Sequence, residues 1–209
     1  MKAMFFDLCE TLVCGLVGLN VFPNSVRRNC GIEWKKHFPD GLIHDELFLD
    51  VLRGYIPERA YWEKLIERKG FEIGVIDLEF SMHEALLTVY NGMPGLLRTL
   101  RKQGYTLYLV SDISRESMEF VLNNHKFMEL FEQRFFSCNM GRLKSDPDTF
   151  DYVLRSSGVE PQEAIFIDDD EGNVERATQA GMIGIVYDSK NYKSTEKLKA
   201  ALRWKGVDV

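Results

Sequence analysis

Five short apolar stretches of the chain have the pattern of strands that are buried on both faces. They are nearly continuous in apolar residues, which is typical of parallel strands covered by helices on both sides of a sheet. Three of them lead into polar residues, at Asp7, Ser111 and Asp168. The predicted strands are Ala3 to Phe6, Thr106 to Val110, Arg134 to Phe136, Ala164 to Ile167, and Ile183 to Val186.

Between these stretches, apolar residues recur at the spacing of amphipathic helices. The apolar stripes are Leu96-Leu97-Leu100, Met118-Val121-Leu122, Phe150-Val153-Leu154 and Val174-Ala177-Ala180. We expect Ser114 to cap the second of these helices, and Asp146, which Pro147 follows, to cap the third. Strand and helix alternate from about residue 93 onward, which predicts a doubly wound, Rossmann-like α/β fold.

The segment from residue 13 to residue 91 breaks this alternation, because its helical stripes follow one another directly. The stripes are Leu47-Phe48-Val51-Leu52, Ala60-Trp62-Leu65-Ile66 and Leu78-Met82-Leu86-Val89. We therefore predict an α/β core formed by residues 1–12 and 92–209, into which residues 13–91 are inserted as a helical cap. The candidate contacts of this cap to an anionic ligand are Arg27, Arg28, Lys35 and Lys36.

Charge and cysteine content narrow the class of partner. The 209 residues include 26 basic and 32 acidic side chains, which gives a net charge of -6. Such a protein is not expected to bind nucleic acid or an anionic membrane. The four cysteines show no CxxC spacing, so we expect free thiols in a reducing, cytoplasmic compartment. No apolar run approaches the roughly 18 residues of a membrane span, and the expected state is a monomer or a homodimer.

The polar residues at the strand ends are the candidates for chemistry. In doubly wound sheets, ligands bind beyond the carboxyl ends of the strands, near the point where the strand order reverses. Asp7, Ser111, and Asp168 with Asp169 each come at the end of a predicted strand, and Lys144 precedes a helix in the same half of the chain. We expect these side chains to converge on one site.

Four motifs contain these residues, and they occur in order along the whole chain. The motifs are Asp7-Leu8-Cys9-Glu10-Thr11, "LYLVS" ending at Ser111, "GRLKSDPDTF" with Lys144, and "FIDDDEGNVERATQAGM" with Asp168, Asp169 and Asn173. In this arrangement the chain resembles the haloacid dehalogenase superfamily. The motifs of that superfamily are D-x-D-x-T, a strand ending in Ser or Thr, a Lys before a helix, and D-D-x-x-x-N. The inserted helical segment resembles the cap of that superfamily.

The resemblance implies a Mg²⁺-dependent hydrolase that acts on a small phosphorylated metabolite. It implies that Asp7, Asp169 and the backbone carbonyl of Cys9 bind Mg²⁺, a cation that prefers oxygen ligands. Asp7 is then the nucleophile, and it forms an aspartyl-phosphate that water hydrolyses. Ser111 is expected to hydrogen-bond a phosphoryl oxygen, and Lys144 to offset the remaining negative charge and hold Asp7 in place.

Four further residues complete the expected site. The residues expected to contact and position the metal ligands and the nucleophile are Thr11, Asp168 and Asn173. Asp112 is expected to lie against the phosphate, at a position where members of the superfamily often have Asn. Its negative charge either strengthens metal binding or weakens phosphate binding, and the alternative is that Asp112 only caps the helix that follows.

Cys9 departs from the D-x-D pattern. The resemblance implies that an Asp here protonates the leaving oxygen and later activates water. A thiol with a reference pKa of about 8.5 is poorly suited to either task near pH 7. Because losing such acid–base help reduces a rate by about 10²- to 10⁴-fold, we predict weak turnover of aryl or acyl phosphates and still weaker turnover of alkyl phosphates. Glu10 and Asp112 are the candidate replacements for the missing acid.

Other functions stay open at this stage. Dehalogenation would use the same nucleophile on carbon, but the superfamily members that do so lose the acidic pair, which this chain retains as Asp168 and Asp169. A non-catalytic protein would bind phosphorylated metabolites or trap a phosphoryl group on Asp7. A response-regulator receiver is disfavoured, because its phosphorylated Asp is expected after a middle strand, whereas Asp7 follows the first strand of the chain. Oxidation of Cys9 is a further candidate means of control.

Overall fold

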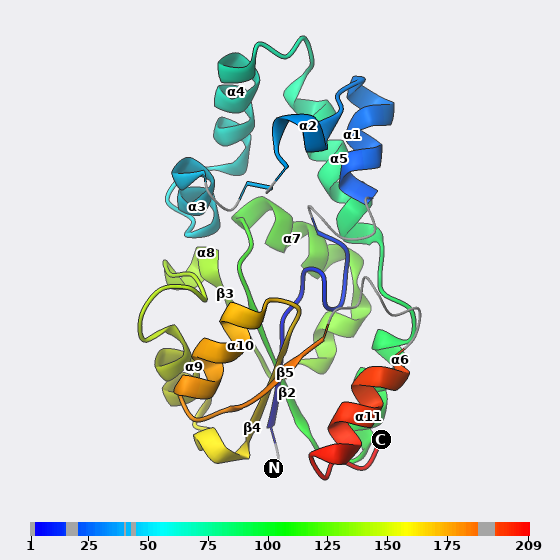
Figure 1. Ribbon diagram of the computed structural model, residues 1–209, viewed down its shortest axis with the longest axis vertical. Helices are drawn as coiled ribbons and strands as arrows, with labels where there is room; N and C mark the ends of the chain where they lie inside the picture. The colour runs from blue at the N-terminus through cyan, green and yellow to red at the C-terminus, as the bar shows by residue number, and fades with distance from the viewer. Residues whose placement is uncertain (1–2, 16–20, 40, 43–44, 188–194) are drawn as a thin grey trace.

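The computed structural model places the expected strands side by side in one sheet. It describes residues 3–15, 21–39, 41–42, 45–187 and 195–209. Within these residues, five parallel strands lie in the order β3-β2-β1-β4-β5 (Figure 1). The strands are β1 (Ala3–Phe6), β2 (Thr106–Ser111), β3 (Gln133–Phe136), β4 (Ala164–Asp168) and β5 (Ile183–Val186). The strand order reverses at β1, so the expected doubly wound α/β fold is confirmed.

The helices fall into two groups along the chain. Those that follow or connect the strands are α6 (Met93–Lys102), α7 (Arg115–Asn124), α8 (Ser137–Met140), α9 (Thr149–Ser157), α10 (Glu171–Gln179) and α11 (Glu196–Trp204), with 3₁₀ turns η2 (Lys126–Leu130) and η3 (Pro161–Glu163). Those inserted between β1 and α6 are α1 (Val21–Cys30), α2 (Trp34–His37), α3 (Glu46–Leu52), α4 (Glu58–Lys69) and α5 (Val75–Leu87).

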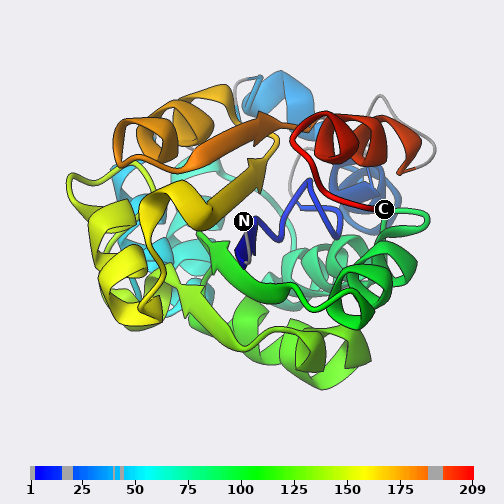
Figure 2. The ribbon, with the colours of Figure 1, turned by 90° about the horizontal axis from the view of Figure 1, so that it is seen from below.

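Successive side chains of β1, β2 and β4 enter two hydrophobic clusters in turn, one on each face of the sheet. Phe5 of β1 belongs to the smaller cluster, together with apolar residues of α9 and α10. Phe6 belongs to the larger cluster, together with residues of α6, α7 and α11. Figure 2 shows helices on both sides of the sheet. Burying each phenylalanine side chain stabilises the fold by about 1.5–3 kcal/mol.

The inserted helices lie at the carboxyl end of the sheet (Figure 1). α5 packs against α1 within the insertion and against α7 below it. Aromatic rings of Phe22, Trp34, Phe48 and Trp62 contact one another in the interior of the insertion. The division into an α/β core of residues 1–12 and 92–209 and a helical cap of residues 13–91 stays a prediction. No helix among the described residues has the length and apolar character needed to cross a bilayer.

Two contacts hold the inserted helices close to the sheet. Arg53, at the end of α3, donates to the carboxylate of Asp146 at 2.8 Å. Gly54 has a φ of +76°, and a Cβ built on it would lie 2.4 Å from the carbonyl oxygen of Cys138. The backbone of the insertion therefore approaches α8 more closely than any side chain at residue 54 would permit.

The prediction that Asp146 caps a helix is wrong. α9 begins at Thr149, and its N-cap residue is Asp148. The carboxylate of Asp146 instead accepts a hydrogen bond from the backbone N–H of Leu143 at 2.8 Å and binds Arg53. A carboxylate that closes its own loop and binds a cation from the insertion has no oxygen left for the helix.

Other helical details differ less. The Ser114 cap is confirmed, because its hydroxyl accepts from the backbone N–H of Ser117 at 3.1 Å. Leu122 is 37% exposed, so its assignment to a buried stripe is wrong. Val89 lies beyond the end of α5 and forms a β-bridge with Val13. The sequence pattern did not predict helices α1, α2, α8 and α11.

Candidate active site

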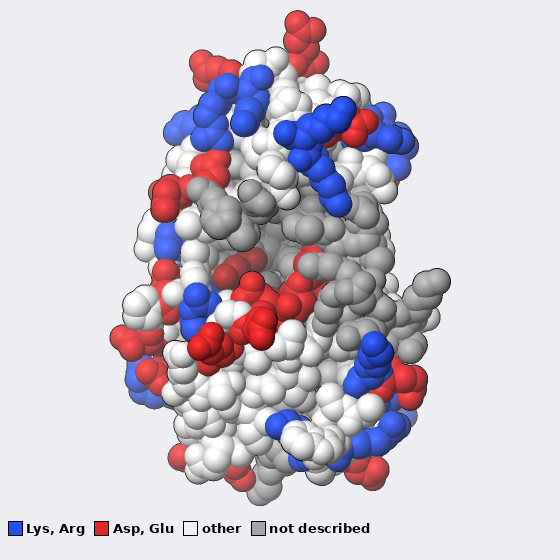
Figure 3. Space-filling view, in the orientation of Figure 1, with Lys and Arg blue, Asp and Glu red and all other residues white. Residues whose placement is uncertain are grey.

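Most of the motif residues meet in one cavity beyond the carboxyl ends of β1, β2 and β4. The cavity has a volume of about 650 Å³ and is covered by α3 and α5 of the insertion. Figure 3 shows acidic side chains gathered in and along the lower edge of a hollow near the middle of this face. The expected site residues that line the cavity are Asp7, Cys9, Asp112, Lys144, Asp168, Asp169 and Asn173. Ser111 and Thr11 are close in sequence to lining residues, but both are fully buried and neither lines the cavity.

Asp7 reaches the cavity because it directly follows β1, the strand that lies between β2 and β4. Phe6 pairs with Leu109 of β2 and with Ile167 of β4, and the N–H of Asp7 donates to the carbonyl of Ile167 at 2.9 Å. The side chain of Asp7 therefore emerges at the middle of the sheet. Asp168 ends β4, the strand beside it.

Lys144 joins two of the carboxylates. Its Nζ donates to Oδ1 of Asp7 at 2.6 Å and to Oδ2 of Asp168 at 2.7 Å, and all three side chains are at least 95% buried. Asp168 also accepts from the backbone N–H of Asp170 at 2.8 Å and from Nδ2 of Asn173 at 3.2 Å. Both oxygens of Asp168 are thus engaged by protein groups, which orients Lys144 toward Asp7.

Three buried oxygens beside this network have no hydrogen-bond partner among the described residues. They are Oδ2 of Asp7, Oγ1 of Thr11 and Oγ of Ser111. Leaving a buried polar atom unpaired costs about 1–3 kcal/mol, and native proteins contain few such atoms. Asp7 is therefore held through one oxygen, while its second oxygen is left for a ligand or for chemistry.

The donor set fits a hard divalent cation. Asp7, Asp168 and Asp169 each offer an oxygen, and these oxygens lie within 4.8 Å of one another. Among the described residues, the charged groups that line the cavity are Asp7, Glu10, Glu58, Asp112, Asp168, Asp169 and Asp170, with Lys144 and Arg176. Seven acidic groups against two basic ones would repel a phosphate dianion, so phosphate binding here requires a further positive charge such as Mg²⁺.

Burial and neighbouring charges shift the titration of this pair. Burial raises the pKa of the Asp7 carboxyl, Lys144 opposes the rise, and Asp168 and Asp169 add to it. Burial lowers the pKa of the Lys144 ammonium, but Asp168 and Asp7 outweigh that effect and raise the pKa well above its usual range. Lys144 therefore stays charged at neutral pH, and a cation bound near Asp7 would favour its carboxylate form.

Cys9 lines the cavity with a half-buried side chain. Burial raises the pKa of its thiol, and the charges of Asp7 and Glu10 raise it further, while Lys144 opposes them. The thiol is therefore protonated at neutral pH and transfers its proton less readily than an ordinary cysteine. The backbone carbonyl of residue 9 does not depend on the side chain, so its expected contact with a metal stays a prediction.

Glu10 is engaged elsewhere, although it also lines the cavity. Its Oε1 accepts from the backbone N–H of Gly15 at 3.0 Å, and its Oε2 accepts from Oη of Tyr90 at 2.9 Å. The residue has a φ of +66°, and its own N–H donates to the carbonyl of Val13 at 2.7 Å. Glu10 thus closes the loop after β1 and ties it to the segment before α6, which argues against its role as a replacement acid.

Asp112 fixes the loop that contains Lys144. Its two carboxylate oxygens accept from the backbone N–H of Lys144 at 3.0 and 3.2 Å. Burial raises the pKa of Asp112 to about 6, and the nearby Lys144 opposes this rise. The alternative of a helix cap is wrong, because Ser114 caps α7. Asp112 is thus an ionisable group on the cavity wall whose pKa lies near neutrality.

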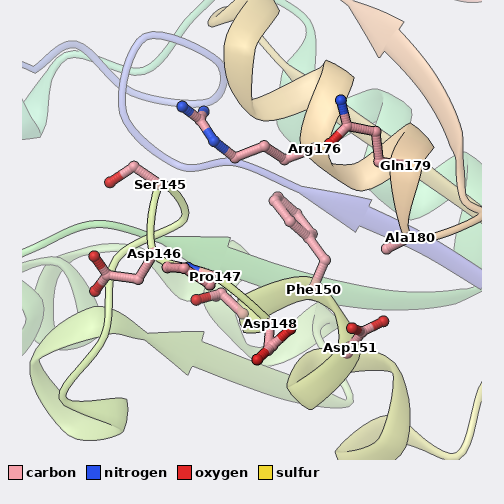
Figure 4. Close-up of a pocket in the computed structure, with 10 residues that line it drawn as sticks. Ser145, Asp146, Pro147, Asp148, Phe150, Asp151, Arg176, Gln179 and Ala180 are labelled. Carbon is pink, nitrogen blue, oxygen red and sulfur yellow. The ribbon is translucent and has the colours of Figure 1, made fainter.

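A second hollow of about 410 Å³ lies beside the cavity (Figure 4). Asp146, Asp148 and Asp151 lie on one side of it, and Arg176 and Gln179 of α10 on the other. The residues that line this hollow do not include Asp7, Lys144, Asp168 or Asp169, so it is not the site that the sequence predicted.

The candidate cations of the insertion do not reach the cavity. Arg27 lies 3.8 Å from Glu33, and Arg28 pairs with Glu84 at 2.8 Å. These two residues, Lys35 and Lys36 are absent from the described lining of the cavity.

Glu58 lines the cavity and was not singled out from the sequence. It is 5% exposed, and its carboxylate accepts from Nε1 of Trp62 at 3.0 Å, from Oγ of Ser117 at 2.8 Å and from Oγ of Ser114. Trp62 lies one helical turn away, which a sequence pattern can suggest. The two serines follow more than 50 residues later, and only the folded chain reveals that pairing.

The fold and the site define an α/β protein with an acidic, lysine-bridged cavity at its strand ends. The family model of haloacid dehalogenase-like hydrolases matches residues 56–186. The chain belongs to this family, which confirms the resemblance. The matched range contains Ser111, Lys144, Asp168 and Asp169, and it excludes the first motif around Asp7.

Three curated relatives illustrate the similarity. The sesquiterpene phosphatase astK of Aspergillus oryzae is 28% identical over 144 residues, which cover 69% of this chain and 74% of the relative. Drimenol cyclase drtB of Aspergillus calidoustus is 26% identical over 72% of this chain but only 29% of its own length. A phosphoglycolate phosphatase of Pseudomonas putida is 30% identical over 54% of this chain and 42% of its own length. The chain therefore spans less than half of two of these proteins.

Solved structures share the fold over almost the whole chain. A family member from Bacteroides thetaiotaomicron, crystallised with magnesium and inorganic phosphate, gives a TM-score of 0.72 at 24% identity. The match covers 92% of this chain and 96% of that one. A predicted family hydrolase from Porphyromonas gingivalis gives a TM-score of 0.74 at 22% identity, with 97% and 98% covered. These matches support the same overall architecture, insertion included.

Proposed function

We propose that this protein is a metal-dependent phosphatase in which Asp7 attacks the phosphorus of a small phosphate ester. The arrangement around Asp7 is the observation that carries the proposal. Lys144 holds one carboxylate oxygen at 2.6 Å, and the second oxygen is buried without a hydrogen-bond partner. Mg²⁺ held by Asp7, Asp169 and the backbone carbonyl of Cys9 would supply the positive charge that brings a phosphate dianion to a carboxylate.

The reaction proceeds in two displacements at phosphorus. The free oxygen of Asp7 forms a bond to phosphorus while the bond from phosphorus to the alcohol oxygen breaks, and the alcohol takes up a proton. Water then attacks the phosphorus of the aspartyl-phosphate, which releases inorganic phosphate and restores the carboxylate. Lys144 holds Oδ1 of Asp7 and offsets charge on the phosphoryl group, and Ser111 donates its unpaired hydroxyl to a phosphoryl oxygen.

Cys9 sets the limit of this activity. It occupies the position from which a proton would reach the leaving alcohol, and its raised pKa makes the thiol a poor proton donor. The rate falls least for substrates whose leaving group tolerates negative charge. The enzyme therefore turns over aryl or acyl phosphates more readily than alkyl phosphates. The phosphatases among the relatives support phosphate ester chemistry, and their names give chemically different substrates.

A phosphate-release assay tests the proposal. With 4-nitrophenyl phosphate and acetyl phosphate, we expect release that requires Mg²⁺ and stops on addition of EDTA. Asp7→Asn abolishes it, whereas Asp151→Asn, which changes an exposed carboxylate on α9, leaves it unchanged. No release from either ester by a folded protein loaded with Mg²⁺ contradicts the proposal.

Two alternative functions predict positive results in other assays. Metal-independent chloride release from a 2-haloacid would identify a dehalogenase, although the retained carboxylates of Asp168 and Asp169 favour the phosphatase. A stable phosphate adduct on Asp7, seen by mass spectrometry after acetyl phosphate treatment without turnover, would identify a phosphoryl-trapping protein. Whether the protein acts as a monomer or a homodimer stays a prediction, for which gel filtration is the measurement.

A further inference from the structure

The cavity has two chemically different sides. Its floor at the strand ends is acidic and contains Asp7 and Lys144, as described above. Its opposite wall, contributed by α3 and α5, is apolar and consists of Phe48, Leu49, Leu52, Met82 and Leu86. A ligand whose phosphate lies at the floor therefore places its remaining part against hydrocarbon side chains.

Glu58 does not change the apolar character of this wall. Among the described residues that α3, α4 and α5 contribute to the cavity, Glu58 is the only charged one. Its oxygens accept from the indole N–H of Trp62 and from the hydroxyls of Ser114 and Ser117. A carboxylate surrounded by three protein donors holds the insertion on α7, and it offers no donor to a ligand.

Polar leaving groups match this wall poorly. A sugar, a carboxylate or a second phosphate would give up hydrogen bonds to water, and the wall supplies no polar group in exchange. The same transfer from water is favourable for hydrocarbon surface, in proportion to the area that becomes buried. The volume of about 650 Å³ also exceeds what a phosphate alone requires and falls in the range of sites for small organic ligands.

We infer, on the basis of the proposed phosphatase activity, that the substrate is a phosphate monoester of an apolar alcohol or phenol whose hydrocarbon part packs against Leu49, Leu52 and Leu86. The released product is then a hydrophobic alcohol. Specificity lies in the hydrocarbon contact on the insertion, and the acidic floor supplies only the recognition of phosphate and metal.

Calorimetric titration of the Mg²⁺-loaded protein with alkylphosphonates tests this inference, because the P–C bond resists hydrolysis and binding is measured without turnover. Each added methylene is expected to strengthen binding by about fourfold, so propylphosphonate binds about 15-fold more tightly than methylphosphonate, and hexylphosphonate more tightly again. 3-Phosphonopropionate, which has the length of propylphosphonate but ends in a carboxylate, binds more weakly than propylphosphonate. Equal affinities along the alkyl series, or preference for the carboxylate, overturn the inference.

A pair of leucine variants locates the contact. Leu49→Gln changes a half-buried residue that lines the cavity, and we expect it to reduce hexylphosphonate affinity at least fivefold while methylphosphonate affinity is unchanged. The control is Leu87→Gln, at a residue that is 50% exposed on α5 and does not line the cavity. It changes neither affinity. A Leu49→Gln variant that folds normally and keeps the full chain-length dependence overturns the assignment of the wall.

The outcomes separate the inference from the activity on which it rests. Rising affinity along the alkyl series in a protein that releases no phosphate would refute the phosphatase proposal and keep the apolar ligand class. Mg²⁺-dependent phosphate release combined with equal alkylphosphonate affinities would keep the phosphatase and refute the apolar substrate.

Discussion

Replacing Cys9 by Asp tests whether the missing proton donor limits this enzyme. Residue 9 lines the cavity two positions after Asp7, the proposed nucleophile, and its side chain is half-buried. Burial raises the pKa of the Cys9 thiol most, and the charges of Asp7, Glu10 and Asp169 raise it further. An Asp at this position is exposed to the same influences. They raise the pKa of a carboxyl there too, which makes it a proton donor near neutral pH.

The expected gain depends on the leaving group. Alkyl alcohols leave poorly as anions, so the kcat/KM for hexyl phosphate should rise by about 10²- to 10⁴-fold in Cys9→Asp, which corresponds to about 3–5 kcal/mol of barrier. 4-Nitrophenolate leaves without a proton, so the kcat/KM for 4-nitrophenyl phosphate should rise less than about tenfold. The kcat for both substrates should rise where hydrolysis of the aspartyl-phosphate is slow, because the same carboxylate activates water.

Phosphate release from the two esters, measured in parallel with saturating Mg²⁺, gives both values. Cys9→Asn is the matched control, because its side chain has the shape of Asp without a transferable proton. It should show neither gain. An equal rise in kcat/KM for both esters, or a rise of the same size in Cys9→Asn, would refute the argument and would point to shape or polarity at residue 9 instead.

Two further predictions concern the framework of the site. Gly54→Ala adds a Cβ at 2.4 Å from the Cys138 carbonyl oxygen, whereas Gly70→Ala, at a similar positive φ, meets no atom within 4 Å. Each variant should lose about 1–2 kcal/mol of unfolding free energy because of its left-handed backbone, and only Gly54→Ala should lose about 1–3 kcal/mol more. Urea unfolding measures both losses, and equal losses would contradict the argument. The raised pKa of Asp112 means that the folded protein binds this proton more tightly than the unfolded chain, so its contribution to stability falls as pH rises from about 4 through about 6. Asp112→Asn removes this loss of stability. The unfolding free energy of the variant minus that of the wild type should therefore increase by about 1–3 kcal/mol between pH 4 and pH 7. A difference that does not depend on pH would refute this prediction.

The sheet was predictable because its signals are local. Each strand is a short apolar run, and the strand ends at Ser111 and Asp168 were placed within one residue of their observed positions. The convergence of Asp7, Lys144 and Asp168 followed from topology, since carboxyl ends of parallel strands share one edge of a sheet. Helix α1 was missed because Val21–Cys30 contains a proline, two asparagines and two arginines, and its four buried residues become evident only against α5.

The electrostatic partners could not be predicted because they are distant in sequence. Asp146 follows the pattern of a helix cap, yet its carboxylate binds Arg53 from 93 residues earlier. Glu10 is adjacent to Cys9 and has the right chemistry for an acid, yet Tyr90 and the N–H of Gly15 occupy its oxygens. In both cases the residue type was informative, and the tertiary partner decided its role.

Cys9 and the apolar wall together restrict the substrate from two directions. The poor proton donor favours leaving groups of low pKa, and the wall favours hydrocarbon, so phosphate esters of apolar phenols satisfy both. We expect wild-type kcat/KM for phenyl phosphate to exceed that for hexyl phosphate, which has the same number of carbon atoms, by at least 100-fold, and Cys9→Asp to narrow this gap. If wild type hydrolyses both equally well, another acid serves the leaving oxygen. Asp112 lines the cavity with a pKa of about 6, so it is then the residue to replace, and Asp112→Asn should slow hydrolysis of hexyl phosphate selectively.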